Sequence, residues 1–320
     1  MSASGGNKAI IAAFLANLGI AITKLIAWAV SGSSSMLAES VHSLADSGNQ
    51  ILLLIGGKRA KRAATKEHPF GFGRERFVYA FVVSIILFSV GGVFSIYEGI
   101  QKLQHPHPLE AWWVPILVLI IAIGLESFSL RTAIKESRPL KGNATWVQFV
   151  RHAKAPELPV VLLEDLAALL GLVFAFFGVG LTVITHNSVF DAIGTLLIGA
   201  LLVCVAVVLA IETKSLLLGE GASDTDVAKL ETALVDGKNI ERIIHMKTLY
   251  LGPDEFMVGA KVGVRAEMTA REISVAVNEA ETRARAAVPA ARVIYLESDV
   301  YVDPAEVKPS TESIVLKSSD

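Results

Sequence analysis

A histidine and two carboxylates lie at helical spacing inside a long apolar segment of this chain. His42 and Asp46 are four residues apart, so on a helix their side chains project from one face, one turn apart. Glu39, three residues before His42, shares that face. Ionisable residues inside a membrane-length helix are costly to bury and mark functional sites in a bundle interior. An imidazole nitrogen and a carboxylate oxygen supply half of a four-coordinate transition-metal site. The alternative is a histidine that a neighbouring hydroxyl or carbonyl satisfies.

A second pair of carboxylates, Glu164 and Asp165, occupies another apolar segment. Two adjacent acids in a membrane helix repel each other, which favours a bound cation or protonation of one of them. Pro156 and Pro159 mark the start of this helix, so Asp165 is about two turns from it. The alternative is that both acids stay hydrated near the lipid headgroups. If the first segment supplies half of a metal site, this segment is the candidate for the rest.

Other polar residues of the apolar segments have more ordinary interpretations. Lys24 and Glu98 fall near the ends of their segments, where long side chains reach the interface. Asp191 is expected to cap the start of the last apolar segment. For Glu126, a proton relay, a second metal ligand and pairing with Arg131 or a hydroxyl all remain open.

Composition places this sequence among multi-span membrane proteins. Of 320 residues, 52% are hydrophobic and 19% are charged, and the mean hydropathy is +0.54. This is too apolar for an ordinary soluble domain. The net charge of −2 gives no indication of nucleic-acid binding. The single cysteine, Cys204, excludes an intramolecular disulfide and any metal knuckle built from a cysteine pair.

Six apolar segments each approach the ~20 residues that a bilayer requires. They are residues 9–30, 36–57, 77–100, 112–134, 160–184 and 190–211. Lysine and arginine concentrate in the loops after the second and fourth segments, whereas the loop after the third contains only Lys102. The positive-inside rule therefore places both termini and both basic loops in the cytoplasm. Trp112 and Trp113 then anchor the chain at the outer interface.

The composition becomes charged after residue 211, and no later segment is long enough to span a membrane. Capping and alternation signals predict the order helix, strand, strand, helix, strand, at about 224–235, 241–251, 256–264, 270–288 and 291–302. This order predicts an α+β domain with an antiparallel-containing sheet and two helices on one face. The predicted domains are a transmembrane domain at 1–212, a cytoplasmic α+β domain at 213–303 and a flexible tail at 304–320.

Several stretches coincide with a known family when they are taken in order. They are HSLAD (42–46), HPFGFGR (68–74), GG (91–92), YEGI (97–100) and LLED (162–165), followed by Gly171 and the α+β region. Over about residues 7–302 this combination resembles the cation diffusion facilitator family of divalent-metal/proton antiporters. The LLED stretch and the HPFGFGR loop are most similar to the branch that includes the mitochondrial zinc transporter of solute-carrier family 30.

The resemblance implies a homodimer in which each protomer has six transmembrane helices and a ferredoxin-like cytoplasmic domain. It also implies a tetrahedral metal site between the second and fifth spans, where zinc carriers have HxxxD on both helices. His42, Asp46 and Asp165 match that pattern. The remaining histidine position falls on Val161, which has no ligand atom.

The fourth ligand therefore stays open. At about 100° per residue, Glu164 and Asp165 flank the face of the helix on which Val161 lies. Glu164, with its longer side chain, is the possible fourth ligand, and water or Glu39 are its competitors. One nitrogen with two or three oxygens is a harder ligand set than two histidines and two aspartates, which brings Mn²⁺ and Fe²⁺ closer to Zn²⁺.

The resemblance also implies metal binding in the cytoplasmic domain, where His245, Glu297 and Asp299 are weak candidates. The alternative for them is an ordinary strand surface. His105 and His107 are interpreted as residues of an outer loop rather than a ligand pair.

The expected function is alternating-access export of Zn²⁺, or of Mn²⁺ or Fe²⁺, from the cytoplasm in exchange for protons. The expected partners are the metal ion, protons, the lipid bilayer and a second copy of the chain, with no resident cofactor. The alternative is a membrane-bound metal sensor or scaffold that signals through its cytoplasmic domain without vectorial transport. An enzyme is not expected, because no HExxH motif occurs. The lack of an Arg/Ser-rich presequence favours a bacterial inner (cell) membrane.

Overall fold

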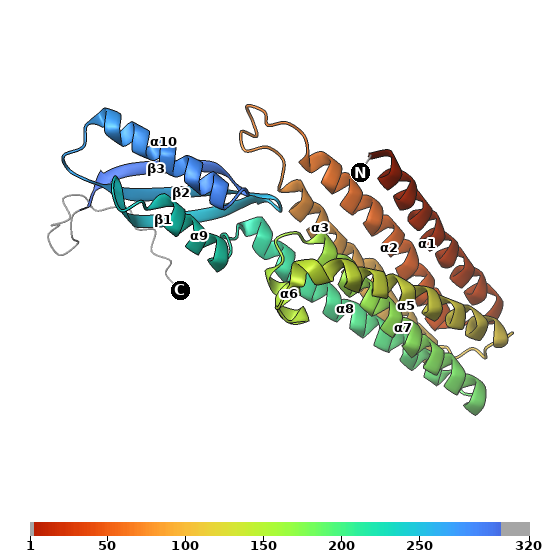
Figure 1. Cartoon of the computed structure of the whole chain (residues 1–320). Helices are drawn as coiled ribbons and strands as arrows, with labels where there is room; N and C mark the ends of the chain where they lie inside the picture. Colours follow the sequence, from red (N-terminus) through yellow and green to blue (C-terminus); the bar gives the residue numbers. More distant parts are fainter. Residues whose placement is uncertain (1–2, 302–320) are drawn as a thin grey trace. The chain divides into compact units, whose positions relative to one another are not determined.

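Two compact units make up the chain in this computed structural model, which describes residues 3–301 and, in α1, side chains from residue 17 onward. The first unit comprises Met1–Gly219 and Leu251–Asp254, and the second comprises Glu220–Tyr250 and Glu255–Asp320. The first is helical and the second contains a three-stranded sheet (Figure 1). The predicted flexible tail, 304–320, lies outside the described residues.

Helices cover each of the apolar segments of the first unit. They are α1 (Ala3–Ser31), α2 (Ser34–Ala60), α3 (Glu75–Ile86), η1 (Leu87–Val93), α4 (Phe94–Gln104), α5 (Trp113–Lys141), α6 (Trp146–His152), α7 (Glu157–Thr185) and α8 (Val189–Leu218). The elements α3, η1 and α4 form one continuous helix, in which η1 is a π-helical turn. In Figure 1, α1, α2, α5, α7 and α8 run lengthwise beside one another.

Four helices of the described chain are long and apolar enough to cross a membrane. These are Glu75–Gln104, Trp113–Lys141, Glu157–Thr185 and Val189–Leu218, and the described part of α1, Asn17–Ser31, is a shorter apolar helix. Helix α2 is less apolar because serines and ionisable residues line one of its faces. The first unit is therefore a helical membrane domain. Its core contains buried side chains such as Met36, Leu87, Leu119, Leu172 and Leu202.

The helix bundle has two distinct ends, which are named here for later use. The basic end carries the loop 61–74, which follows α2, and the segment 142–156, which follows α5 and contains α6. The serine end carries the turn between α1 and α2, where Ser33 caps α2 by accepting a hydrogen bond from the backbone N–H of Met36. Since α1 and α2 are antiparallel neighbours, a residue late in α1 and a residue early in α2 both lie near the serine end.

The second unit has the predicted order of elements. These are α9 (Asp224–Leu234), β1 (Ile240–Gly252), β2 (Glu255–Val264), α10 (Ala270–Ala287) and β3 (Ala291–Val300). The strand order is β1-β2-β3, and β2 pairs with β3 in parallel from Phe256 opposite Ala291 to Val264 opposite Val300. The buried Ala276, Ala280 and Ala284 recur every four residues on α10, so one stripe of this helix faces the core of the unit.

The loop between α9 and β1 is held by one carboxylate. Asp236 Oδ1 accepts hydrogen bonds from the backbone N–H groups of Lys238, Asn239 and Ile240, at 2.9, 2.8 and 3.0 Å. Arg283 lies 3.6 Å from the other oxygen. Partial burial opposes ionisation, but these donors and the guanidinium outweigh it and hold the pKa of Asp236 below its usual range.

This arrangement makes a prediction about pH and stability. Because the pKa of Asp236 is lower in the folded state, the carboxylate stabilises the fold above the unfolded-state pKa of about 3.9, and this contribution is lost as pH falls. We expect Asp236→Asn to weaken the 236–240 loop by about 1–2 kcal/mol at pH 7. Hydrogen exchange of residues 238–240 in the full chain measures this change. Equal protection in the variant and the wild type at pH 7 would contradict it.

Candidate metal site

Helix α2 presents a stripe of polar side chains to the bundle interior. Glu39, His42, Asp46 and Asn49 follow at intervals of three or four residues and so share one face of the helix. Glu39, His42 and Asn49 are fully buried, and the Asp46 side chain is 17% exposed. His42 Nδ1 lies 3.4 Å from Asp46 Oδ1.

Each of these four side chains has buried polar atoms without a hydrogen-bond partner among the described residues. They are Glu39 Oε1, both ring nitrogens of His42, Asp46 Oδ1 and Asn49 Oδ1. A buried polar group left unpaired costs about 1–3 kcal/mol, so native proteins leave few of them. A row of unpaired oxygen and nitrogen atoms along one helix face has the chemistry that a cation requires.

Helix α7 brings the second set of predicted ligands to the same place. Asp46 shares a small cavity of about 30 Å³ with Val161, Glu164 and Asp165. The remaining lining residues are Asn17, Ile20, Ser43, Gln50, Glu126 and Ser129, so α1, α2, α5 and α7 all contribute to its wall. Glu126, which the sequence left open between three roles, therefore lies at this cavity.

Two hydrogen bonds orient the acids of α7. Asn49 Nδ2 donates to Glu164 Oε1 at 2.8 Å, and Ser129 Oγ donates to Asp165 Oδ2 at 2.9 Å. Glu164 is buried and Asp165 is half-buried. Asn49 and Ser129 were not singled out in the sequence. Asn49 shares the α2 stripe with His42 and Asp46, and that periodicity is the signal that identifies it.

His42 lies beside this cavity rather than in its wall. Its Nδ1 faces η1, since a Cβ added to Gly91 would lie 3.9 Å from that nitrogen. Single π-helical turns occur frequently at functional sites. Among the described residues, no group of three or more His, Cys, Asp or Glu side chains is arranged to hold a metal ion. The predicted ligands thus surround one small region without converging on a single point.

Lys24 is a residue of this site that the sequence interpretation missed. The expectation that it reaches the membrane interface is wrong, because its side chain is fully buried. Its Nζ donates to Glu39 Oε2 at 2.9 Å and to Ser43 Oγ at 2.7 Å. The available signal was its spacing on α1, where it lies seven residues after Asn17 and four after Ile20, on the face that lines the small cavity.

Asp191 also acts differently from its prediction. It lies in the first turn of α8, fully buried, and its carboxylate caps α2 rather than α8. It accepts hydrogen bonds from Ser33 Oγ and the Ser34 backbone N–H, both at 2.8 Å, and from the Ser35 N–H at 3.3 Å. An anionic side chain is favoured there because the N-terminus of a helix presents unpaired N–H groups and a positive partial charge.

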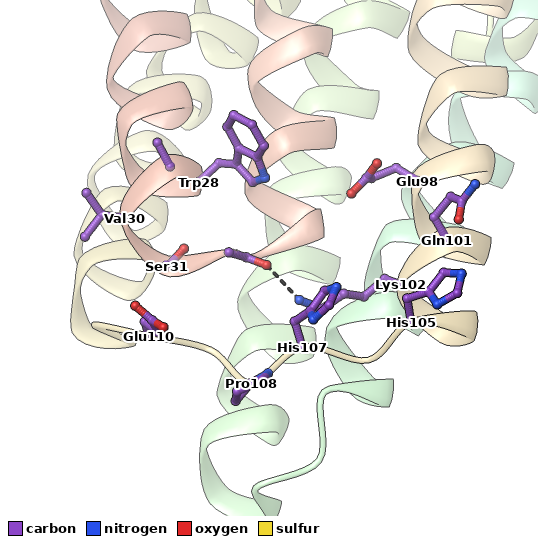
Figure 2. A pocket seen from close by; sticks show the side chains of 12 residues that line it. Trp28, Val30, Ser31, Glu98, Gln101, Lys102, His105, His107, Pro108 and Glu110 are labelled. Carbon is purple, nitrogen blue, oxygen red and sulfur yellow. Dashed lines mark hydrogen bonds between the residues drawn. The ribbon is translucent and has the colours of Figure 1, made fainter.

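A second cavity, of about 720 Å³, lies at the serine end. Figure 2 shows Trp28 of α1 and Glu98 of α4 on its two sides, with His105 and His107 on the loop that follows α4. The dashed line in Figure 2 is the hydrogen bond from Lys102 Nζ to the Gly32 carbonyl, at 2.7 Å. The two histidines thus lie in a loop, as expected.

The weak candidates in the second unit are not brought together. Glu297 and Asp299 on β3 pair with Lys261 of β2, at 3.1 and 2.7 Å. The hydrogen bond from Lys261 lowers the pKa of Asp299. His245 is on β1, and β2 lies between it and β3. The acids therefore already have a cation partner, and the imidazole is two strands away.

Comparison with known proteins identifies the helical unit. Residues 10–218 match the family described as the cation efflux transmembrane domain. The proton-coupled zinc antiporter SLC30A9, mitochondrial, of Xenopus laevis is 33% identical over 289 residues, which cover 87% of this chain and 51% of that protein. The human protein of the same name is 30% identical, covering 83% of this chain and 47% of its own length. Metal tolerance protein C4 of Arabidopsis thaliana is 29% identical, covering 82% and 58%.

These relatives correct the predicted location. Four relatives from vertebrates are named as mitochondrial, so the expectation of a bacterial inner membrane is wrong. That expectation relied on the start of the chain. This chain spans about half the length of the animal relatives it matches.

The resemblance noted in the sequence is confirmed by both kinds of match. The family match covers more than half of the chain, and the relative from Xenopus laevis aligns with most of it. This chain therefore belongs to the cation efflux family, the cation diffusion facilitator family of transporters.

Proposed function

We propose that this protein is a divalent-metal/proton antiporter that carries Zn²⁺ by alternating access, with Mn²⁺ and Fe²⁺ as competing substrates. The observation that supports it most is the small cavity shared by Asp46, Glu164 and Asp165, beside the unpaired nitrogens of His42. Zinc ranks first because relatives that align with most of the chain are named proton-coupled zinc antiporters. The family is one of transporters, and no enzymatic activity is proposed.

The proposed ligands are His42, Asp46 and Asp165, with Glu164 as the fourth. Binding requires the helices to close on the cavity, because Asp46, Glu164 and Asp165 line it without converging and His42 lies beside it. Glu164 then exchanges its hydrogen bond from Asn49 for the metal. Antiport follows from ligand chemistry, since protons and metal compete for the same lone pairs.

The proposed assembly is a homodimer with six transmembrane helices per protomer, in a mitochondrial membrane. Helices α1 and α2 supply the two spans beyond the four strongly apolar ones, because each is long enough to cross a bilayer. The second unit, with two helices and a three-stranded mixed sheet, is proposed to be a ferredoxin-like domain. The metal is proposed to move from the basic end to the serine end, against protons.

Metal flux into proteoliposomes tests this function. Purified full-length chain is reconstituted, and uptake of Zn²⁺, Mn²⁺ and Fe²⁺ is followed with and without an imposed pH gradient. The proposal expects uptake that follows the gradient and reverses when the gradient is reversed. Stoichiometric metal binding without flux in either direction would instead indicate a sensor.

The valine in the α7 motif provides a test of metal selectivity. Val161 lines the small cavity together with Asp46 and Asp165, so an imidazole placed there is within the proposed site. We expect Val161→His to raise the preference for Zn²⁺ over Mn²⁺ by about tenfold or more, because a second nitrogen makes the site softer. Competition uptake with both metals measures the ratio, and Val161→Asn controls for size. An unchanged ratio of Zn²⁺ to Mn²⁺ uptake in Val161→His would show that residue 161 is not part of the metal site.

A further inference from the structure

Residues of helix α1 line both cavities, and Lys24, one partner of a buried ion pair, lies between those residues along the helix. Asn17 and Ile20 line the small cavity, and Trp28 lines the large one. Lys24 is four residues after Ile20 and four before Trp28, about 6 Å along the helix from each. Residues four apart share a helix face, so Lys24 lies between Ile20 and Trp28 on the same face of α1.

Helix α2 has the same order of features. Ser43 and Asp46 line the small cavity, and Glu39 lies one turn from Ser43 toward the serine end. The pair of Lys24 Nζ and Glu39 Oε2, 2.9 Å apart, is fully buried on both sides. Two paired charges are therefore buried on α1 and α2 just beyond the small cavity, toward the serine end.

Lys24 bonds only one of the two carboxylate oxygens of Glu39. Glu39 Oε1 has no hydrogen-bond partner among the described residues. It lies against α7 at Gly171, where an added Cβ would be 2.6 Å from it, so any larger residue at this position requires the carboxylate to shift. Lys24 Nζ has a second partner, Ser43 Oγ, at 2.7 Å. The carboxylate thus has an open oxygen, and the ammonium has a partner that remains if Glu39 releases it.

We propose that Glu39 is a second cation-binding site on the transport path, held by the Lys24 ammonium until a divalent metal displaces it. The metal passes from the ligands around Asp46 to Glu39 Oε1, the ammonium stays with Ser43, and the metal then enters the large cavity at the serine end. This proposal rests on the proposed transport function, because it describes how the same ion leaves. Lys24 acts as a tethered cation that closes the path while no metal is present.

Charge explains why such a device is suited to a divalent ion. A buried carboxylate and a buried ammonium are each costly alone and much less so as a pair, so the empty path keeps both neutralised. A divalent ion attracts the carboxylate twice as strongly as the ammonium does at equal distance, and therefore can replace it. Without the lysine, Glu39 would hold the metal and release it slowly.

Substitution of the two partners, separately and together, tests the proposal. Bound Zn²⁺ is counted on the full chain in detergent, and Zn²⁺ flux is measured in proteoliposomes. We expect about one ion per chain in the wild type and about two in Lys24→Met, in which a carboxylate ligand becomes unpaired. We expect flux in Lys24→Met to fall at least about tenfold, because breaking a buried pair leaves one charge uncompensated. Lys135→Met removes an exposed lysine of α5 and should match the wild type in both measurements.

The double variant separates a binding role from a structural one. In Lys24→Met/Glu39→Gln the extra ion should disappear and flux should rise above that of Lys24→Met. A merely structural ion pair predicts one ion in every variant, and it also allows flux to recover in the double variant because no uncompensated charge is left. The ion count therefore decides, and one ion in Lys24→Met would overturn the proposal. If Lys24→Met does not fold, the flux and the number of bound ions in Glu39→Gln test the proposal instead. Flux at least about tenfold lower with the first ion still bound supports the proposal, and wild-type flux overturns it.

The number of bound Zn²⁺ ions tests the second site independently of the proposed transport function. A wild-type chain that shows no flux in either direction refutes antiport, whereas the number of ions in Lys24→Met still reports the second site. Flux in the wild type together with one ion in Lys24→Met refutes the second site alone.

Discussion

Proteoliposomes that contain Asp165→Asn are expected to show no proton-driven metal flux above the level of empty liposomes. Asp165 lies on α7 at the small cavity, where Ser129 Oγ orients one of its oxygens at 2.9 Å. Asparagine preserves the shape and the hydrogen bond but removes the negative charge that binds a divalent cation. Loss of one charged ligand in a largely buried site costs about 3 kcal/mol or more, which lowers affinity more than about 100-fold.

Comparison with neighbouring acids makes this test specific. Asp46→Asn should have the same effect, since Asp46 shares the cavity from the side of α2. Glu136→Gln, at an exposed position of α5, removes a carboxylate from the same unit and should retain wild-type flux. His42→Ala should weaken or uncouple transport rather than abolish it, because the carboxylates still bind metal. Wild-type flux from Asp165→Asn at equal protein density would exclude Asp165 as a ligand.

Removing the carboxylate of Asp191, which belongs to α8 and caps the start of α2, is expected to have the second large effect. Asp191 accepts hydrogen bonds from Ser33, Ser34 and Ser35 and joins α8 to the helix that carries His42 and Asp46. In Asp191→Ala several donors lose their partner and the N-terminus of α2 loses a capping charge. We expect a loss of about 3–5 kcal/mol in stability, with the loss of metal flux as a consequence.

A graded series distinguishes this role from a general sensitivity of the fold. Ser33→Ala removes one of the hydrogen bonds to Asp191 together with the α2 cap and should cost only about 1–2 kcal/mol. Thermal unfolding of the full chain in detergent ranks the wild type above Ser33→Ala, and Ser33→Ala above Asp191→Ala. Hydrogen exchange of residues 33–37 should increase in the same order. Equal unfolding temperatures for Asp191→Ala and the wild type would show that α2 does not depend on this carboxylate.

Local sequence patterns determined the helical elements and most of the candidate ligands. Long apolar runs can bury their backbone polar groups in a bilayer only as helices, so the helices of the first unit follow from composition. The capping box at Thr269 and the alternation of apolar residues likewise located α10 and the strands of the second unit. The spacing of His42 and Asp46 determined that they share a helix face, because helical period alone sets that relation.

Tertiary structure decided which partners the buried charges have. Lys24 and Glu39 are 15 residues apart, on two helices, and Asp191 bonds to serines more than 150 residues away. No local pattern reports such pairs, so a lysine near the end of an apolar segment was expected at the interface and an aspartate before a helix was expected to cap it. A charge inside a membrane is stable only beside a partner, and the packing of the helices determines which partner it meets.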